Sequence, residues 1–597
     1  MKRMLAASLI LALLGPAALA AGPEEDLWSR KEGDGSYVTV RVPYPEGEEL
    51  NWSEKTRLLV RYADTGEPVA LTSDYWRGSL FATVPAAEAG RPLEVVRGEE
   101  HHFPDCITVW NEREYYEEPV GAGGLYLRGV LQGDQAGRLN PEAVLTRAEA
   151  FALIARLLML EPEGEPGYTD VSPSDWYYET AGAVRAAGIA AADERFHPER
   201  PVTRAEVTAI VARAMERMGW LDQKRAAEED PSDWYEDAAF LPAWAVEDYV
   251  SLARSGAAAI QTWNMVGTGE DGGPVYQLCS ESDKPATRGE IVEFLSSVLQ
   301  YVPCYPTGTA IEWGFDREMP VVDGSTSSYP YTEAIYRTFF INSRNHLQFP
   351  RSHSKSHESY ERLIGGEVDL LFAATLPSEE LKEQAKATGV ELEFIPIACD
   401  AMVFFTNAEN PVSGLTRAQI QDIYVRGAYD NWKQVGGPDA ALLPYRRNAD
   451  SGSHALMERY FLEGGRLSLS PDVHNVLTSY AMSSALTDIA SALRTDPPAY
   501  AMGYSVYAYY QNSYWLLAGV PGDGRELKLL AIDGVLPTEE TIADGSYPLS
   551  DYNYVVLRAD EPEDSPARRL AEFMCSEEGQ ACVSAAGFQP LRQEKNA

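Results

Sequence analysis

Cysteine, positive charge and long apolar runs are all scarce in this chain of 597 residues. The six cysteines are scattered, and no spacing among them resembles a metal site, so we expect neither metal nor cofactor. Lys and Arg number 50 against 90 Asp and Glu, and a formal net charge of −40 argues against nucleic acid and anionic lipid as partners. The apolar run at residues 5–14 is too short to span a bilayer, and no other apolar stretch is long enough to be a transmembrane helix. We therefore expect no membrane insertion.

The cysteines offer little support for disulfides. Six cysteines allow fifteen pairings, but Cys575 and Cys582 lie in one expected helix, where seven residues rise about 10 Å. We therefore expect mostly free, buried thiols.

The N-terminus has the pattern of a signal peptide. Lys2 and Arg3 precede the apolar run, and Ala18-Leu19-Ala20 forms a small-x-small cleavage site. Residues 1–20 are therefore predicted to direct export, and the remaining length predicts several domains.

Three short segments repeat one another. They begin at Thr146, Thr203 and Thr287, each followed by Arg, a small residue and Glu, and each opens an apolar helical run. Thr-x-x-Glu is a capping box, in which the hydroxyl and the carboxylate satisfy free amides at the helix start. Capping alone does not explain why Arg recurs at positions 147, 204 and 288, and a repeat of this scale predicts stacked units with a shared core.

The text between the helix starts carries a family resemblance. Residues 170–177 read Asp-Val-Ser-Pro-Ser-Asp-Trp-Tyr, residues 230–235 read Asp-Pro-Ser-Asp-Trp-Tyr, and Gly188-Ile189 and Phe196-His197-Pro198 separate the first two starts. This pattern resembles three S-layer homology (SLH) repeats over 110–302, at about 110–162, 165–220 and 228–302. The third carries an insertion around residues 267–274.

The resemblance implies an α-helical three-repeat module that binds an anionic secondary cell-wall polysaccharide. The protein would then be secreted and held at the cell wall, in the S-layer of the cell surface. Arg147, Arg204 and Arg288 suit carboxylates, because a guanidinium can bind one bidentately. Trp176 and Trp234 would offer flat faces to a sugar, or else belong to the core.

Residues 28–108 predict a small all-β domain. Apolar residues alternate at 37–42 and in part at 57–62, further short runs lie at 80–84 and 93–96, and Gly, Pro and Asp turns separate them. We expect an antiparallel sandwich without a catalytic group. His101 and His102 lie in an acidic stretch and are expected to be solvated.

The sequence of the C-terminal half has the alternating strand and helix pattern of an α/β fold. Residues 319–322 form a strand that runs into Asp-Gly-Ser-Thr-Ser-Ser at 323–328 and then a helix. Residues 443–447 run into Asn-Ala-Asp-Ser-Gly-Ser at 448–453 and then another helix. A helix N-terminus offers free amides and partial positive charge, so two of them facing each other suit an oxyanion.

The order of further motifs carries a second resemblance. Gly366-Glu367-Val368-Asp369, Asn410-Pro411-Val412 and Gly587-Phe588-Gln589-Pro590 follow in sequence. Residues 313–595 resemble a periplasmic-binding-protein-like domain of the phosphate-binding (PstS-type) family. That family has a two-lobed type II α/β fold, which implies crossing strands here at 396–406 and near 503–510.

Carried over by position, the resemblance implies an oxyanion site between the lobes. Its residues are Ser325, Thr326, Ser356, Thr375, Arg447, Ser451, Gly452 and Ser453. Arg446 competes with Arg447, and a surface salt bridge is the alternative role for Arg447. Phosphate-specific members carry an Asp where this chain reads Phe372-Ala373-Ala374-Thr375, so the ligand is phosphate or a related oxyanion.

These observations favour a cell-wall-anchored solute-binding protein and not an enzyme. Its partners would be the oxyanion, the polysaccharide and an ABC permease or sensor that receives the ligand. The alternative is a structural S-layer protein whose binding domain has lost its ligand. A hydrolase is disfavoured, since no nucleophile elbow or metal motif occurs and Ser453 and His454 are adjacent on a helix start.

Overall fold

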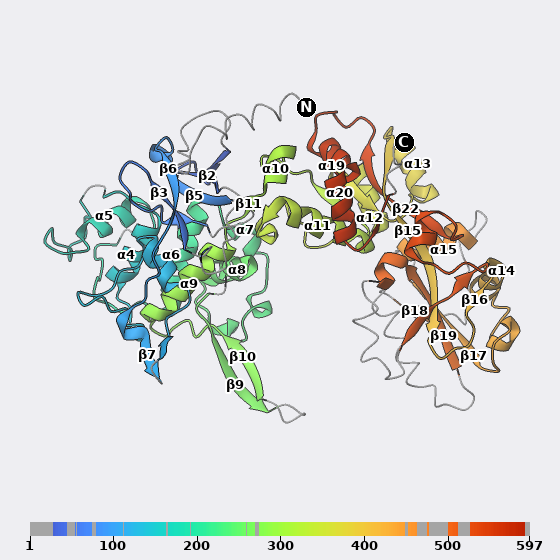
Figure 1. Ribbon diagram of the computed structural model, residues 1–597, viewed down its shortest axis with the longest axis horizontal. Coiled ribbons are helices and arrows are strands. Elements are labelled where there is room, and N and C mark those ends of the chain that lie inside the picture. The colour runs from blue at the N-terminus through green and yellow to red at the C-terminus, as the bar shows by residue number, and fades with distance from the viewer. Residues whose placement is uncertain are drawn as a thin grey trace. The chain divides into compact units, whose positions relative to one another are not determined.

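A computed structural model describes residues 28–44, 54, 57–73, 79–110, 113–162, 165–190, 193–257, 259–268, 274–447, 452–461, 474–476, 499–511 and 526–591. The predicted signal peptide lies outside these ranges. The chain forms two compact units (Figure 1). The first reaches to Tyr305 and includes Asn342–Leu347, and the second comprises Pro306–Ile341 and the chain from Gln348 onward.

The first unit begins with strands. β1 (Ser29–Glu32), β2 (Tyr37–Pro43), β5 (Ser79–Pro85) and β4 (Leu71–Thr72) form an antiparallel sheet in that order, and β3 (Leu58–Tyr62) pairs with β6 (Leu93–Arg97). Val40, Val42 and Leu80 from the first sheet and Val60 and Leu93 from the second share one core. β7 (Ile107–Trp110) and β8 (Arg113–Tyr116) add a hairpin.

The rest of the first unit is mainly helical. Its helices are α3 (Ala122–Leu127), α4 (Arg147–Leu157), α5 (Tyr178–Ala186), α6 (Arg204–Arg217), α7 (Gln223–Ala226), α8 (Val246–Ser255) and α9 (Arg288–Tyr301). The capping boxes predicted at the starts of α4, α6 and α9 are all formed. β9 (Thr262–Thr268) and β10 (Pro274–Cys279) form a hairpin where an insertion was expected, and Figure 1 shows it extending from the helices.

The three repeats close into a ring through their backbone. The N–H of Arg147 donates to Arg200 O at 2.9 Å, that of Arg204 to Lys284 O at 2.8 Å, and that of Arg288 to Ala143 O at 2.9 Å. Each bond joins the start of one helix to the loop before the next, and the third returns to the first. The repeat therefore specifies one shared core, in which Phe151, Ile210 and Phe294 are buried.

The second unit is built on one nine-stranded sheet with the order β12-β14-β22-β15-β19-β17-β18. The strands are β12 (Val322–Gly324), β14 (Leu370–Ala373), β22 (Ser550–Arg558), β15 (Leu392–Asn407), β19 (Ala499–Val506), β17 (Ala441–Arg447) and β18 (His474–Val476), and β20 (Leu527–Leu529) and β23 (Gln589–Pro590) also pair with β15. The 16-residue β15 is the element common to both halves of the unit.

Two sets of helices cover the two halves of this sheet. α11 (Tyr329–Phe339), α12 (Ser356–Ile364), α13 (Glu379–Thr388), α19 (Pro566–Cys575) and α20 (Glu577–Ala585) belong to the first half, and α14 (Arg417–Gln421), α15 (Gly452–Phe461) and α18 (Glu539–Ala543) to the second. Leu363, Leu371 and Val556 share one core, and Phe404 and Trp432 share another. This is the two-lobed α/β arrangement expected of the C-terminal half.

The second crossing strand was predicted wrongly. β19, near residues 503–510, pairs with β15 only at Met402–Thr406, and its other partner is β17 of the second lobe. The chain then stays in the second lobe, because β20 pairs with Phe405–Asn407 and Tyr547 and Leu549 lie in the second core. β22 makes the return, since it pairs with residues 392–401 of β15.

All six cysteines are free thiols, but only three of them are buried, whereas mostly buried thiols were expected. Cys106, Cys399 and Cys582 are buried, Cys279 and Cys304 are half-buried and Cys575 is exposed. The expectation of one helix carrying both Cys575 and Cys582 was wrong. α19 ends at Cys575, and Ser576 caps a new helix by accepting the N–H of Gly579 at 3.1 Å. A Cβ on Gly579 would lie 1.8 Å from Phe573 O, so the corner requires glycine.

Candidate functional site

The two loops predicted to hold an oxyanion follow strands whose carboxyl ends point toward each other. β12 and β14 run parallel, and β14 and β15 both run antiparallel to β22, so β12 follows the direction of β15. β17 runs parallel to β19, which is antiparallel to β15. The carboxyl ends of β12 and β17 therefore face each other along β15.

The first loop turns tightly after β12. A Cβ on Gly324 would lie 2.2 Å from Phe372 O, so only glycine fits this close approach of the two strands. Ser325 is buried, and its Oγ lies 3.1 Å from the hydroxyls of Ser327 and Ser328. Thr326 is exposed at the start of the short 3₁₀ turn that leads into α11.

Asp323 holds the second element of this lobe in place. The buried carboxylate accepts hydrogen bonds from the N–H of Ser354 at 2.8 Å and from its hydroxyl at 2.6 Å, and it pairs with Arg362 of α12. His353 is buried beside it, with Nε2 2.9 Å from Thr332 Oγ1 and Nδ1 2.9 Å from Ser325 O. Burial lowers the pKa of His353, which favours the neutral ring.

The start of α12 combines strain with an unused hydroxyl. Lys355 precedes the helix with φ of +97°, a conformation that a residue with a side chain rarely adopts. Next to it, the buried Oγ of Ser356 has no hydrogen-bond partner within the described part of the chain. An unsatisfied buried hydroxyl costs free energy, so strain and an open donor coincide at a residue predicted to bind the anion.

Arg447 ends β17 in the other lobe and is only 9% exposed. Its backbone N–H donates to Tyr504 Oη at 3.1 Å, and burial lowers the pKa of its guanidinium. The neighbouring Arg446 is half-exposed, as expected for the adjacent residue of a strand. Ser453 is buried in the first turn of α15, which Gly452 opens, while Ser451 lies outside the described residues.

Thr375 follows β14 and so lies at the same end of the first lobe as Ser325. It is buried, and its carbonyl accepts a hydrogen bond from the hydroxyl of Tyr360 at 2.8 Å. Ala373 and Ala374 before it are buried as well. The segment in which the resemblance implies an acidic side chain for phosphate-specific members is thus buried here and carries no carboxylate.

In the first unit, two of the three repeat arginines bind neighbouring repeats. Arg204 pairs with Glu290 at 2.5 Å and with Glu281 at 2.9 Å, and Arg288 pairs with Glu149 at 3.0 Å. The partners Glu149 and Glu290 are the capping-box carboxylates of the next helix around the ring. Sequence reasoning missed this role, because the partners are remote along the chain.

Arg147 breaks the pattern. Glu206, its counterpart carboxylate, pairs with Arg200 at 2.5 Å. The Arg147 guanidinium lies over the rings of Phe151 and Phe196, at 4.9 and 5.7 Å from their centroids. Its Nε is buried without a hydrogen-bond partner in the described ranges, and burial together with the charge of Arg200 lowers its pKa.

The two predicted tryptophans differ in exposure. Trp176 is 61% exposed and packs edge-on against Tyr177, which lies 6.1 Å from Phe196. Ring contacts thus place Trp176 in the same region as Arg147. Trp234 is half-buried and packs against the core of the repeats.

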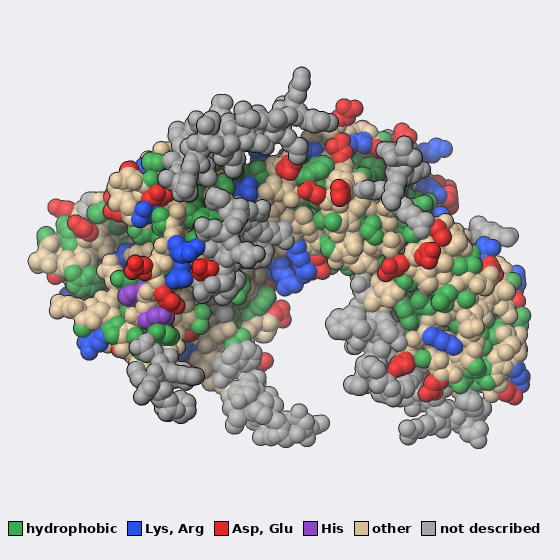
Figure 2. Space-filling model, viewed as in Figure 1, with side chains coloured by type: hydrophobic (Ala, Val, Ile, Leu, Met, Phe, Trp, Pro, Cys, Tyr) green, Lys and Arg blue, Asp and Glu red, His purple; other side chains and the backbone are tan. Residues whose placement is uncertain are grey.

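Two further features of the described residues bear on metal and membrane binding. These residues contain no group of His, Cys, Asp and Glu arranged to hold a metal ion. None of the helices that the structure describes is both long and apolar enough to cross a bilayer. Figure 2 shows acidic side chains spread over the visible surface rather than gathered at one place.

Comparison with known families agrees with both resemblances. Residues 316–578 match the family described as PBP superfamily domain, and residues 125–151 and 167–208 match the S-layer homology domain. The chain joins S-layer homology sequence to a PBP superfamily domain. The matched SLH segments contain the start of α4, the whole of α5 and the start of α6, and the matched PBP segment contains both predicted oxyanion loops.

Several individual proteins are similar to parts of this chain. A phosphate-binding protein PstS of Borreliella burgdorferi is 25% identical over 273 residues, which are 45% of this chain and 89% of that protein. The surface-layer 125 kDa protein of Lysinibacillus sphaericus is 28% identical over 35% of this chain, but over only 16% of its own length. A putative phosphate ABC transporter substrate-binding protein from Clostridium perfringens, solved with phosphate, is 24% identical over 45% of this chain and 98% of its own, with a TM-score of 0.34.

Proposed function

We propose that this protein is a solute-binding protein of the cell surface, whose PBP superfamily domain binds phosphate or a related oxyanion between its lobes. The observation that carries this proposal is the unpartnered Ser356 hydroxyl beside the strained Lys355, in the lobe opposite the buried Arg447. A buried donor without a partner and a nearly buried cation both gain free energy when an anion arrives. The similarity to PstS proteins supports the same ligand class.

The side chains proposed to bind the oxyanion would contact different oxygens of it. Arg447 would hold two oxygens through its planar guanidinium, while Ser325, Ser356 and Ser453 would donate to the others. Thr375 can donate or accept, whereas a carboxylate only accepts. The site therefore does not demand a protonated oxyanion, and we infer that it tolerates sulfate better than a phosphate-specific site does.

Thermal unfolding of the mature chain in rising concentrations of phosphate, sulfate and chloride tests this function. A ligand that binds only the folded state raises the free energy of unfolding, by about 3 kcal/mol when the ligand concentration is one hundred times its Kd, and therefore raises the melting temperature. We expect phosphate and sulfate to raise the transition of the second unit while chloride does not. No shift with either oxyanion would count against the proposal.

We further propose that the SLH repeats bind an anionic cell-wall polysaccharide and that Arg147 and Trp176 make the contact. Arg204 and Arg288 already have carboxylate partners, whereas the Arg147 guanidinium lies over aromatic rings and pairs with no carboxylate of the described residues. Trp176 exposes a ring for stacking on a sugar. The tether would keep the binding domain outside the membrane, where it can pass its ligand to an ABC permease or a sensor.

Cosedimentation with purified cell walls tests this tether. Arg147→Gln and Trp176→Ala should each reduce the bound fraction, while Arg138→Gln, which alters an exposed arginine paired with Asp134, should not. Equal sedimentation of the wild type and the three variants would contradict the proposed contact.

A structural S-layer role without ligand is the second candidate. The buried Ala373-Ala374-Thr375 segment, which lacks a carboxylate, and the similarity to a surface-layer protein favour it. Binding of either oxyanion to the second unit would exclude it.

A further inference from the structure

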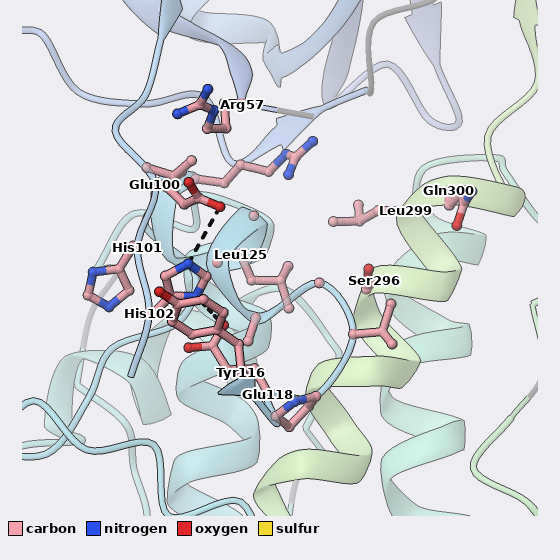
Figure 3. Close-up of a pocket in the computed structure, with 18 of the residues that line it drawn as sticks. Arg57, Glu100, His101, His102, Tyr116, Glu118, Leu125, Ser296, Leu299 and Gln300 are labelled. Atoms are coloured by element: carbon pink, nitrogen blue, oxygen red, sulfur yellow. Dashed lines mark hydrogen bonds and ion pairs between the residues drawn. The ribbon is translucent and has the colours of Figure 1, made fainter. Parts of the chain in front are cut away.

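A cavity of about 500 Å³ lies in the first unit, and none of the residues proposed above to bind a ligand lines it (Figure 3). Its walls are the loop after β6, the start of α3 and the second half of α9. Ser296 and Gln300 of α9 line it, and eight residues separate Ser296 from Arg288, which is about 12 Å along the helix. A cavity of this size can enclose one or two sugar rings.

One wall combines an aromatic face with carboxylates. The ring of His102 stacks on Tyr116 with 3.7 Å between centroids, and its nitrogens lie 3.2 Å from Glu118 and 3.5 Å from Glu100. Glu118 is fixed in turn by the N–H of Phe103. The expectation that His101 and His102 are solvated was wrong, because His102 stacks on Tyr116 and His101 stacks on Tyr126 at 3.5 Å.

A second wall carries positive charge. Arg57 and Arg128 both line the cavity, and the buried Arg128 donates from Nε to Thr72 O at 3.0 Å. A Cβ on Gly124 would lie 2.9 Å from an Arg128 Nη, so this glycine makes room for the guanidinium. Figure 3 shows Arg57 and Glu100 on one side of the cavity and Leu299 and Ser296 on the other.

We propose that this cavity binds a carboxylate-bearing sugar. Guanidinium groups bind a carboxylate bidentately, while Glu100 and Glu118 can accept hydrogen bonds from ring hydroxyls and the Gln300 amide can both accept and donate them. Leu125 and Leu299 give the apolar surface that the C–H faces of a sugar require. A polyphosphate ligand suits the cavity poorly, since two carboxylates would repel its several charges.

Three probes separate the parts of this proposal. Saturation-transfer NMR and calorimetry on the mature full-length chain would compare D-glucuronic acid with D-glucose, which lacks the carboxylate, and with propionate, which lacks the ring. We expect D-glucuronic acid to bind about tenfold more tightly than either, the size of one charge-assisted interaction. Failure to bind, or equal binding of glucose, overturns the proposal.

Variants place the ligand in the cavity. Arg57→Gln should weaken D-glucuronic acid about tenfold, and Arg57→Lys, which keeps the charge but loses the fork, should weaken it less. Arg138→Gln and Arg147→Gln should leave it unchanged, which separates this cavity from the proposed polysaccharide contact. Binding that is unaltered in Arg57→Gln, or equally weakened by Arg147→Gln, overturns the assignment.

Discussion

Arg288 Nη1 lies 3.0 Å from Glu149 Oε1 and so joins the third repeat to the first. The same Glu149 accepts the N–H of Thr146 at 2.9 Å and thereby caps α4. One carboxylate thus stabilises a helix start and the closure of the ring. Packing explains the recurring Arg and Glu at two of the three positions, and Arg147 is the arginine proposed above to contact the polysaccharide.

Removal of a ring arginine should destabilise the first unit. Arg204 is 7% exposed and bridges Glu281 and Glu290, so Arg204→Gln should lower the free energy of unfolding by about 2 kcal/mol. Arg147→Gln should cost about 1 kcal/mol or less, because only contacts with two rings are lost. Differential scanning calorimetry of both variants measures the difference, and equal losses would contradict the distinction.

Loss of the Ser356 hydroxyl should lower oxyanion affinity without lowering the stability of the free protein. Its Oγ has no partner within the described residues, so Ser356→Ala should leave the melting temperature of the free protein unchanged or slightly raised. Oxyanion affinity should fall about tenfold, the value of one hydrogen bond to a charged ligand. Ser327→Ala is the control, since that hydroxyl already contacts Ser325 at 3.1 Å. Unchanged affinity in Ser356→Ala would remove this residue from the site.

A side chain at position 324 should break the first oxyanion loop. The Cβ of Gly324→Ala would lie 2.2 Å from a backbone oxygen that cannot easily move, and we expect a cost of about 3 kcal/mol or more. Gly389→Ala is the matched control, because nothing lies within 4 Å of its added Cβ and only the positive φ is strained, at about 1 kcal/mol. Chemical denaturation compares the two, and equal costs would contradict the close approach.

Asp400 should make the second unit less stable as pH rises. Burial raises the pKa of this carboxyl to about 6. Its Oδ1 accepts the N–H groups of Ala401 and Ala508, while Oδ2 has no partner within the described residues. Between pH of about 4 and 6 the folded state keeps a proton that the unfolded chain has released, so this group lowers the free energy of unfolding by about 2–3 kcal/mol across that window.

Asp400→Asn should abolish that pH-dependent loss. The amide retains Oδ1 as acceptor, and its Nδ2 can donate to Asn553 Oδ1, which is buried without a partner in the described part of the chain. Calorimetry at pH 4 and pH 7 measures the effect, with the exposed Glu379→Gln as control. If the free energy of unfolding of the second unit changed equally between pH 4 and pH 7 in the wild type and in Asp400→Asn, the proposed effect of Asp400 would be contradicted.

The structure contains the local patterns that the sequence predicts. The features that were missed are contacts between residues far apart in the sequence. The Thr-x-x-Glu caps and the strand-loop-helix text around Ser325 depend on neighbouring residues, and both are present. The ion pair of Arg204 with Glu290 and the support of α12 by Asp323 join residues far apart in sequence. No spacing in a single sequence reveals such partners.

Two further misses have physical causes. The return crossing was placed near residues 503–510 on the family resemblance alone, but pairing of β20 with β15 holds the chain in the second lobe. His102 was expected in solvent because acidic residues surround it, whereas those carboxylates bind its ring and form a cavity wall. Charge along the chain predicts neither burial nor ring stacking.

Isothermal titration of the mature chain with phosphate, alongside its Arg447→Gln and Arg446→Gln variants, tests the central claim most directly. The two arginines are adjacent, but only Arg447 is buried at the strand end that faces the Ser325 loop. We expect binding by the wild type and by Arg446→Gln, and at least a roughly hundredfold loss with Arg447→Gln. Absence of heat from the wild type with both phosphate and sulfate, or equal affinity of the two variants, would contradict a solute receptor built on this pair of loops.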